Sequence, residues 1–391
     1  MIPISKPYFD DEDLEIIQQP LKKGWVVQGE YVKKFEEMFS DWTGAKHSIA
    51  VSSCTTALHI SLAALGIKPG DEVILPSFTW ISTANSIEYT GAKPVFIDID
   101  TRTFNIDLQK IEEKITGKTK AIIPVHLFGL CADMDVIMKL AYKHNLKVIE
   151  DAACGFDSYY NGKHSGRFGD TGCFSFHPRK SITTGEGGMI ITDDDETAKI
   201  CRSLRDHGAV KSDFQRHQDK YSFLLSEYPY LGYNYRMTDI QGALGTTQMK
   251  KAKNILEDRR RIAKIYDEEL KEITGIELPL KDKDYIHGYQ SYVLLFRPEI
   301  KKFKAIENQS EIRNKMLAEM EEKGVITRQG THCAALQKFY TEKYGYTAKD
   351  FPNGNIAEKL SITLPLFPYM KDEEISKVIK TFKETCKKYL S

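Results

Sequence analysis

The sequence carries no excess of charge of either sign. Lys and Arg together number 55, as do Asp and Glu, so the formal net charge at pH 7 is +0. Proteins that bind nucleic acid usually show a basic excess or a basic stripe. The three consecutive arginines at 259–261 are interpreted instead as a solvated helix face. We therefore expect no nucleic-acid partner.

Paired cysteines are also missing. The seven cysteines form no Cys-x-x-Cys motif and no tight cluster with histidine, which argues against zinc, iron–sulfur and disulfide-framework proteins. We predict no metal site. An odd number of scattered thiols is typical of a reducing compartment. The cysteines stand at positions 54, 131, 154, 173, 201, 333 and 386.

Long apolar runs are absent as well. No run approaches the length that spans a membrane. The first residues, MIPISKPYFDDEDLE, have neither the basic nor the apolar region of a signal peptide. We predict a cytoplasmic protein without a membrane partner.

What the sequence does contain is an alternation of two hydrophobic periods. Short runs that are apolar throughout are each followed by a segment with helical spacing. Such runs suit strands buried on both faces of a parallel sheet, and strand–helix repetition implies right-handed βαβ units. The expected strands span residues 72–76, 94–99, 121–128, 147–152, 172–176 and 188–192, and the expected helices span residues 30–42, 55–65, 80–89, 108–115 and 134–144, with a helix-rich region at 238–270.

The pattern changes after about residue 250. A strand is predicted at 289–296, a helix at 311–323, a second strand at 325–329 and a terminal helix at 372–389. A chain of 391 residues is too long for one ordinary core. The sequence thus predicts an α/β protein. A three-layer α/β/α large domain with a mostly parallel sheet spans residues 1–250, including the N-terminal segment, and a smaller α+β domain spans residues 251–391.

Polar residues follow several expected strands, which is where ligands bind in open α/β sheets. In SSCTTALH, small hydroxyl residues precede a helix whose positive N-terminal end favours a phosphate, although capping by Ser53 or Thr55 is the simpler explanation. Asp151 ends a buried run, where an acid is costly unless it is paired. Trp80 is either packing or a flat platform for a ring. Lys180 lies in SFHPRKSITTGEGGM, where a solvated charge is the simplest explanation.

Together these residues fit the chemistry of pyridoxal phosphate. This cofactor needs a lysine for a Schiff base, a carboxylate at its ring nitrogen, an anion site for its phosphate and a surface against its ring. The protonated ring nitrogen makes the ring an electron sink. A lysine suits both covalent roles, because its amine condenses with a carbonyl and, once displaced, moves a proton between carbons.

Over nearly its whole length the sequence resembles the DegT/StrS family of sugar aminotransferases, within the fold-type I pyridoxal phosphate enzymes. The matching motifs are KGWVVQGEYVKKFE, SSCTTALHISLAALGIKPGDEVILPSFTWISTAN, AIIPVHLFG, VIEDAA, GCFSFHPRKSITTGEGGM and GYNYRMTDIQGALG. The last two, in this order, are the most specific.

The resemblance implies a role for each matching residue. Lys180 forms the covalent Schiff base and Asp151 pairs with the pyridine nitrogen, and these two are the catalytic residues. Homodimers of the family share their active sites. The remaining cofactor contacts are stacking by Trp80, phosphate binding by Cys54, Thr55 and Ser175, a contact near the ring hydroxyl by Cys154, where the family often has Gln or His, and a contact by Asn234 to the phosphate of the neighbouring subunit.

The implied reaction moves an amino group from L-glutamate, which leaves as 2-oxoglutarate, to a nucleotide-linked 3- or 4-keto-6-deoxy sugar in amino-sugar and polysaccharide biosynthesis. The cofactor passes through its pyridoxamine phosphate form. Candidates for substrate binding are Trp25, Tyr31, Arg236, Arg328 and His332.

Three alternatives remain open. The enzyme acts on a cyclitol, or it is a sugar dehydratase, or the chain is a regulator that binds the cofactor without catalysis. Relatives that act as dehydratases carry His in place of the lysine, so Lys180 argues against that branch.

Overall fold

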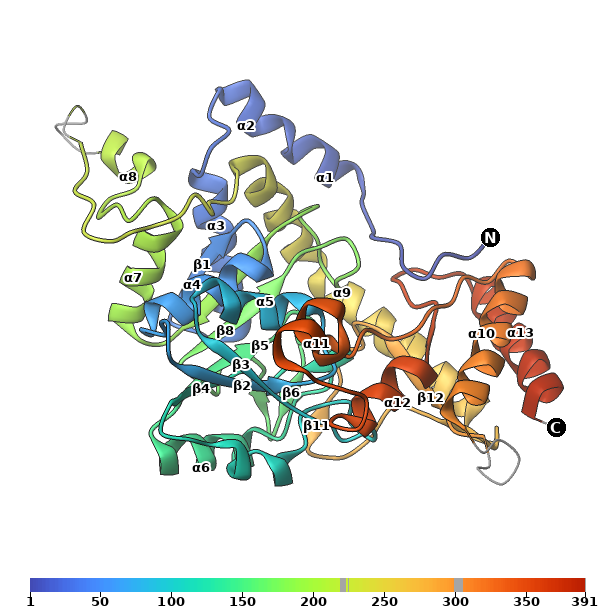
Figure 1. The fold of residues 1–391 in the computed structure, drawn as a ribbon. Helices are drawn as coiled ribbons and strands as arrows, with labels where there is room; N and C mark the ends of the chain where they lie inside the picture. Colours follow the sequence, from blue (N-terminus) through green and yellow to red (C-terminus); the bar gives the residue numbers. More distant parts are fainter. Residues whose placement is uncertain (219–222, 224, 299–304, 391) are drawn as a thin grey trace.

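The computed structural model describes residues 1–218, 223, 225–298 and 305–390. Its centre is a seven-stranded sheet in the order β1-β9-β8-β5-β4-β2-β3 (Figure 1). Neighbouring strands run parallel from β3 across to β8, whereas β9 runs antiparallel to both of its neighbours. The strands are β1 His47–Val51, β2 Glu72–Pro76, β3 Lys93–Ile97, β4 Thr119–Ile122, β5 Lys147–Asp151, β8 Thr171–Ser175 and β9 Gly188–Thr192.

Successive side chains of these strands enter opposite layers, which explains their continuous apolar character. In β2, Val73 and Leu75 join one hydrophobic cluster, whereas Ile74 joins another. Because side chains alternate across a strand, a sheet covered on both faces needs apolar residues at every position.

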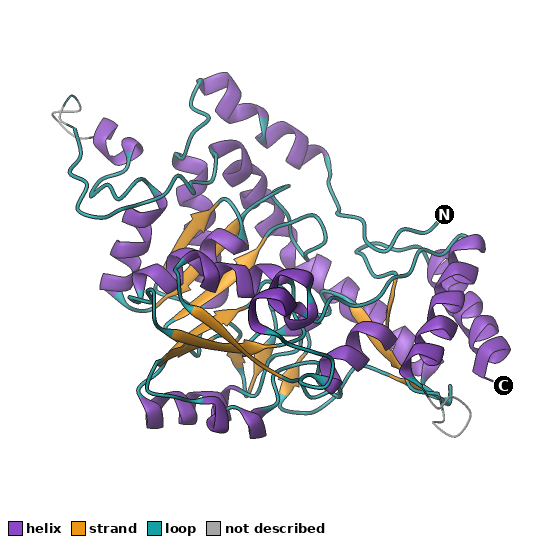
Figure 2. Ribbon diagram, viewed as in Figure 1, coloured by secondary structure: helices purple, strands orange, loops and turns teal. Residues whose placement is uncertain are grey.

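Helices cover both faces of this sheet (Figure 2). Leu58 of α4, Ile87 of α5 and Cys201 of α7 pack in one cluster with Val73 and Leu75. The other face is covered by α3, α9 and α6. The predicted three-layer α/β/α architecture is confirmed. The helices are α3 Glu30–Thr43, α4 Cys54–Ala64, α5 Ile81–Tyr89, α6 Met134–His144, α7 Asp195–Arg205 and α9 Asp239–Leu270.

The C-terminal part is built on a second, antiparallel sheet in the order β10-β12-β13. Residue 250 lies inside α9, so a domain boundary between 250 and 251 stays a prediction. The elements here are β10 Ile276–Glu277, β12 Tyr292–Phe296, β13 Ser361–Leu364, α10 Ile306–Glu322, α11 Lys338–Tyr344, α12 Pro352–Leu360 and α13 Asp372–Leu390, and a small third sheet joins β11 Tyr285–Ile286 to β6 Tyr159–Tyr160 and β7 Lys163–His164.

The N-terminal segment connects the C-terminal part with α9. Ile2 is buried and pairs in parallel with Val325, so the N-terminus lies beside the C-terminal sheet and helices (Figure 1). Further along, the carboxylate of Asp13 lies 2.6 Å from the Lys251 amine of α9. Three short helices complete the fold, α1 Asp11–Ile16, α2 Gln18–Lys23 and α8 Asp213–Gln218.

Three predicted elements differ from the structure. Residues 108–115 form two 3-10 turns, Leu108–Lys110 and Glu112–Lys114, because this segment has a single buried side chain to hold a helix in place. The strand predicted at 121–128 ends at Ile122, two residues before Pro124, which has no N–H to donate to a sheet. Residues 325–329 form two isolated β-bridges, one from Val325 and one from Arg328, instead of a regular strand.

The solvated face predicted for the arginines at 259–261 is wrong for Arg259. Its side chain is 1% exposed and donates hydrogen bonds to the carbonyls of Tyr289 and Gln290, at 3.0 and 2.6 Å. Arg259 thus fastens α9 to the segment that leads into β12. Among the helices of the described residues, none has the apolar stretch that a membrane crossing requires.

Candidate active site

Lys180 and Asp151 follow adjacent parallel strands of the large sheet. Strands β5 and β8 pair with Asp151 opposite Cys173, and Asp151 is the last residue of β5. Ser175 ends β8, and a turn from Ser175 to Lys180 follows it. The carboxyl ends of parallel strands meet at one edge of the sheet, where ligands bind in this fold class.

Asp151 is a buried carboxylate held by two donors. It is 4% exposed. The Thr83 hydroxyl donates to Oδ2 at 2.7 Å and the Ala153 amide donates to Oδ1 at 3.1 Å. Burial raises the pKa of this carboxyl, and these hydrogen bonds, followed by the charge of Lys180, partly oppose the rise. A carboxylate in this position gains stability from a nearby cation.

Lys180 is half-buried, and its amine points to a thiol. Nζ donates to Sγ of Cys154 at 3.2 Å, and the Lys180 backbone amide donates to the carbonyl of His177 at 2.8 Å. Cys154 lies three residues after Asp151, and the charge of Lys180 acts on the Asp151 carboxyl, so the end of β5 and the turn after it supply both groups that interact with the lysine. The structure thus brings three predicted site residues together.

The start of α4 presents backbone N–H groups beside β9. Ser53 and Thr56 cap this helix reciprocally: Oγ of Ser53 accepts from the Thr56 amide at 3.2 Å, and the Ser53 amide donates to Thr56 at 3.1 Å. The predicted capping by Ser53 is therefore confirmed, whereas Thr55 takes no part in it. A Cβ at Gly188 would lie 2.4 Å from the carbonyl carbon of Ser53, so only glycine allows this approach.

Trp80 precedes α5 and exposes its ring. The side chain is 59% exposed, and its ring centroid lies 6.2 Å from that of His332. The Thr79 amide donates to the His332 carbonyl at 3.1 Å. His332 also contacts a carboxylate oxygen of Glu358 at 3.3 Å. Two predicted residues from distant parts of the sequence are thus neighbours.

The remaining cofactor candidates and Arg236 lie near the same strand ends. Oγ of Ser175 accepts from the His177 amide at 3.4 Å. Asn234 is exposed and forms an isolated bridge with Asp206. Arg236 forms an ion pair with Asp206, so this substrate candidate already has a partner within the chain.

Trp25 and Tyr31 contact other parts of the molecule. The Trp25 ring lies 5.3 Å from that of His217, and the Lys23 amine lies 5.5 Å from the centre of the Tyr31 ring. Within the described residues, no contact joins either one to Lys180 or Asp151. Arg328 lines a pocket with Arg179, close to the lysine.

Sequence reasoning missed three polar residues around Asp151, which are Thr83, His126 and Glu150. Besides Thr83, a fully buried pair is formed by Glu150 and His126, with Oε2 2.8 Å from Nε2. The Ala132 amide donates to His126 Nδ1 at 3.1 Å, which places the ring proton on Nε2, so His126 donates to Glu150. The backbone amides of residues 166, 168 and 169 also donate to Glu150. The sequence signal that could have pointed to Glu150 is the pair of adjacent acids in VIEDAA.

Comparison with known proteins identifies the family. The model of the DegT/DnrJ/EryC1/StrS aminotransferase family matches residues 7–383. The chain belongs to this family. This match confirms the sequence-based expectation of an aminotransferase of the DegT/StrS group.

Two bacterial proteins resemble the chain over nearly its full length. It is 38% identical to spore coat polysaccharide biosynthesis protein SpsC of Bacillus subtilis over 387 residues, 99% of this chain and 97% of the relative. It is 36% identical to GDP-perosamine synthase of Escherichia coli O157:H7, with 98% of each chain covered.

Solved structures share the fold of the chain. The putative sugar aminotransferase Spr1654 from Streptococcus pneumoniae in its PMP-form has a TM-score of 0.91 at 29% identity, with 100% of both chains covered. The PLP-form of the same protein has a TM-score of 0.90 at 28% identity. The chain thus has the fold of a putative sugar aminotransferase whose structure is solved in a PMP-form and a PLP-form.

Proposed function

We propose that this chain is a pyridoxal phosphate-dependent aminotransferase that moves the amino group of L-glutamate to the keto group of a nucleotide-linked sugar. The main support is that Lys180 and the buried Asp151 stand at the ends of adjacent strands. The acceptor class is supported by the relative named GDP-perosamine synthase, and a 3- or 4-keto-6-deoxy sugar is the proposed substrate.

The Asp151 carboxylate fits a protonated ring nitrogen. Burial raises the pKa of Asp151, and among the described residues it forms no ion pair. A pyridinium N–H would supply the positive charge that this buried oxygen pair lacks. Thr83 and Ala153 hold the two oxygens in place, so the carboxylate is oriented before a ligand arrives.

The strand ends around Lys180 fit the rest of the cofactor. The Cys54 and Thr55 amides begin α4, where N–H groups have no partner within the helix and favour a phosphate. We assign the phosphate to these amides, the Thr55 hydroxyl and Ser175. The exposed ring of Trp80 is the proposed stacking surface, and Cys154, beside the lysine amine, is placed near the ring hydroxyl.

When bound, pyridoxal phosphate supplies an electron sink for the negative charge left on a carbon that loses its proton. With the cofactor bound, Asp151 would keep its ring nitrogen protonated. Lys180 would hold the cofactor covalently, and its amine, once freed, would accept the proton from Cα of L-glutamate. The amine is within reach of the strand ends because the turn after Ser175 is short.

The proposed enzyme is a cytoplasmic homodimer with shared active sites. Asn234 is exposed on its own chain, as expected of a side chain that reaches the phosphate in a partner subunit. All seven cysteines are free thiols, which suits a reducing compartment.

Absorption spectroscopy tests the cofactor assignment. The purified protein should be yellow, and borohydride should bleach the visible band and fix a pyridoxyl group on the peptide that contains Lys180, as read by mass spectrometry. Lys180→Ala should lose the covalent link. A wild-type protein that stays colourless with added pyridoxal phosphate would rule out the assignment.

The donor is tested separately. L-glutamate should convert the visible spectrum to that of the pyridoxamine form, with stoichiometric release of 2-oxoglutarate. A panel of nucleotide-linked 3-keto and 4-keto sugars is then added to the enzyme in its pyridoxamine form. The true acceptor should return the original spectrum. A spectrum that no amino acid changes would exclude transamination.

A further inference from the structure

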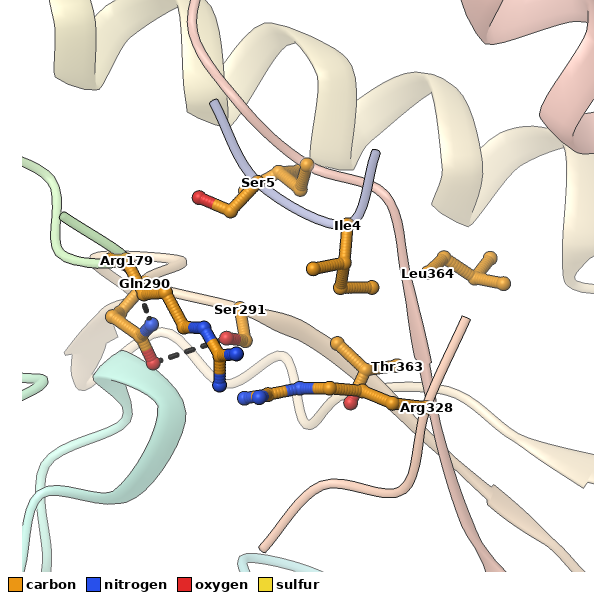
Figure 3. Close-up of a pocket in the computed structure, with 9 residues that line it drawn as sticks. Ile4, Ser5, Arg179, Gln290, Ser291, Arg328, Thr363 and Leu364 are labelled. Carbon is orange, nitrogen blue, oxygen red and sulfur yellow. Dashed lines mark hydrogen bonds between the residues drawn. The ribbon is translucent and has the colours of Figure 1, made fainter. Parts of the chain in front are cut away.

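Two arginines face each other across a pocket near Lys180. Figure 3 shows the guanidinium groups of Arg179 and Arg328 pointing toward one another, with Gln290, Ser291 and Thr363 beside them. The apolar side of the pocket is lined by Ile4, Leu364 and Leu366.

Neither guanidinium has a carboxylate partner within the described residues. The two guanidinium groups also repel each other. Burial, followed by the charge of Arg179, lowers the pKa of Arg328. The Nε atom of Arg328 and Oγ1 of Thr363 are buried and have no hydrogen-bond partner among the described residues. Two like charges and two unused polar atoms in one pocket are the features of an anion site.

The pocket is built rather than incidental. The Gln290 amide nitrogen donates to the Arg179 carbonyl at 2.8 Å, and its oxygen accepts from the Ser291 hydroxyl at 3.0 Å. The Thr363 amide donates to the Arg328 carbonyl at 2.7 Å. These bonds fix the backbone from which both arginines project.

The pair also lies close to the proposed reaction centre. Arg179 directly precedes Lys180 in sequence, and Arg328 interacts electrostatically with Cys154, which accepts from the lysine amine. Burial lowers the pKa of His177, and the positive charges of Lys180, Arg179 and Arg328 act in the same direction. A ligand bound between the arginines can therefore present another group to Lys180.

We propose that Arg179 and Arg328 together bind a carboxylate of the amino donor. This inference rests on the proposed function, since it assigns the donor site of that reaction. Guanidinium groups match a carboxylate in shape and charge. The apolar wall of Ile4 and Leu364 suits the methylene groups of a small amino acid. A nucleoside diphosphate would extend far beyond this small pocket.

The primary test uses the holoenzymes of Arg179→Gln and Arg328→Gln. It measures, in a single turnover, their conversion to the pyridoxamine form by L-glutamate. Each change should raise the half-saturating glutamate concentration roughly 10- to 100-fold, as expected for loss of a hydrogen bond to a charged group. Arg261→Gln is the matched control, because Arg261 pairs with Asp258 and Asp372, and it should behave like the wild type. Unchanged values in both pocket variants would overturn the proposal.

A binding measurement needs no amino transfer. Glutarate, a dicarboxylate without an amino group, should bind the wild-type holoenzyme in isothermal titration and lose affinity in both variants. If wild-type protein takes no amino group from L-glutamate, the proposed function fails, yet the glutarate titration still decides the role of the arginines. Loss of guanosine or uridine diphosphate binding with unchanged glutarate binding would assign the pair to a nucleotide and overturn the proposal.

A second amino acid identifies which carboxylate is bound. L-Norvaline has the carbon chain of L-glutamate without its second carboxylate. A raised half-saturating concentration for both amino acids would support binding of the α-carboxylate, and a rise for L-glutamate alone would support binding of the side-chain carboxylate.

Discussion

Asp151 places a carboxyl at a buried position, and its pKa shows the cost of charging this group. Burial raises the pKa of this carboxyl above the ordinary value of 3.8. In the range above that value the folded protein holds more protons at this site than the unfolded chain, so its contribution to stability falls as pH rises. A bound pyridinium would offset the free-energy cost of ionising this buried carboxyl. Without such a cation, the cost disappears only when the carboxyl is protonated.

Asp151→Asn should therefore stabilise the cofactor-free protein at pH 7. The amide has no charge to bury, and the gain should shrink as the pH falls from the raised folded-state pKa of the carboxyl toward 3.8, since below that value the wild-type carboxyl is protonated in both states. Urea unfolding of the two apo proteins at pH 7 and at low pH measures the difference. The same variant should bind pyridoxal phosphate more weakly. A variant that is less stable than wild type at pH 7 would contradict this account.

Thr83→Ala should lower kcat/KM roughly 10- to 100-fold, because it removes a 2.7 Å hydrogen bond to the charged form of Asp151. Thr83→Ser retains the hydroxyl and should recover most of the activity. Steady-state kinetics with L-glutamate make the comparison, and equal losses in the two variants would show that the hydroxyl is not what matters.

The sequence predicted Lys180 and Asp151 because each follows a recognisable apolar strand. Thr83 could not be found in the same way. It lies 68 residues before Asp151, on α5 after β2, and β4 stands between β2 and β5 in the sheet. Its bond to Asp151 depends on the strand order, which local patterns do not contain.

At the scale of elements, two glycines explain how α9 packs on α3. Gly242 and Gly245 are three residues apart and so share one helix face. A Cβ at Gly242 would lie 2.5 Å from the Val32 amide nitrogen, and one at Gly245 would lie 2.7 Å from the Phe35 ring. The glycine spacing in QGALG thus has a packing reason.

Gly242→Ala should destabilise the protein by about 1–3 kcal/mol, the usual cost of overpacking, although alanine favours helix by up to about 1 kcal/mol. Gly117→Ala is the control, because no atom lies within 4 Å of a Cβ there. It should change the free energy of unfolding by less than about 0.5 kcal/mol. Denaturant unfolding measures both, and equal stabilities would refute the packing argument.

Elements with a strong apolar period were predictable, and weak ones were not. The strand predicted at 72–76 and the helix predicted at 134–144 match β2 and α6. The helix predicted at 108–115 failed, since Ile111 is its one buried side chain. Periodicity reports a buried face, so it carries no information where tertiary contacts are few.

At the scale of the molecule, the proposed shared active site can be tested by mixing two inactive variants. In the proposed site, one subunit supplies Lys180 and the other supplies Asn234. Lys180→Ala removes the first contribution and Asn234→Ala removes the second. A mixed dimer therefore contains one intact site, with Lys180 from one subunit and Asn234 from the other. Unfolding and refolding the two variants together should restore activity, measured with L-glutamate and the acceptor found in the sugar panel.

Lys180→Ala mixed with Asp151→Asn is the matched control. Both residues come from the same chain, so every site in that mixture lacks one of them, and no activity should return. Restoration in the control, or its absence in the first mixture, would argue against sharing through Asn234.

The docking of the first residues has a consequence for synthesis of the chain. Ile2 pairs with Val325, and its amide donates to the Gly324 carbonyl at 2.8 Å. Val325 must therefore leave the ribosome before Ile2 can pair with it. Domains generally fold from the N-terminus during translation, but here the segment around Ile2 reaches its place only after residues 324 and 325 have been made.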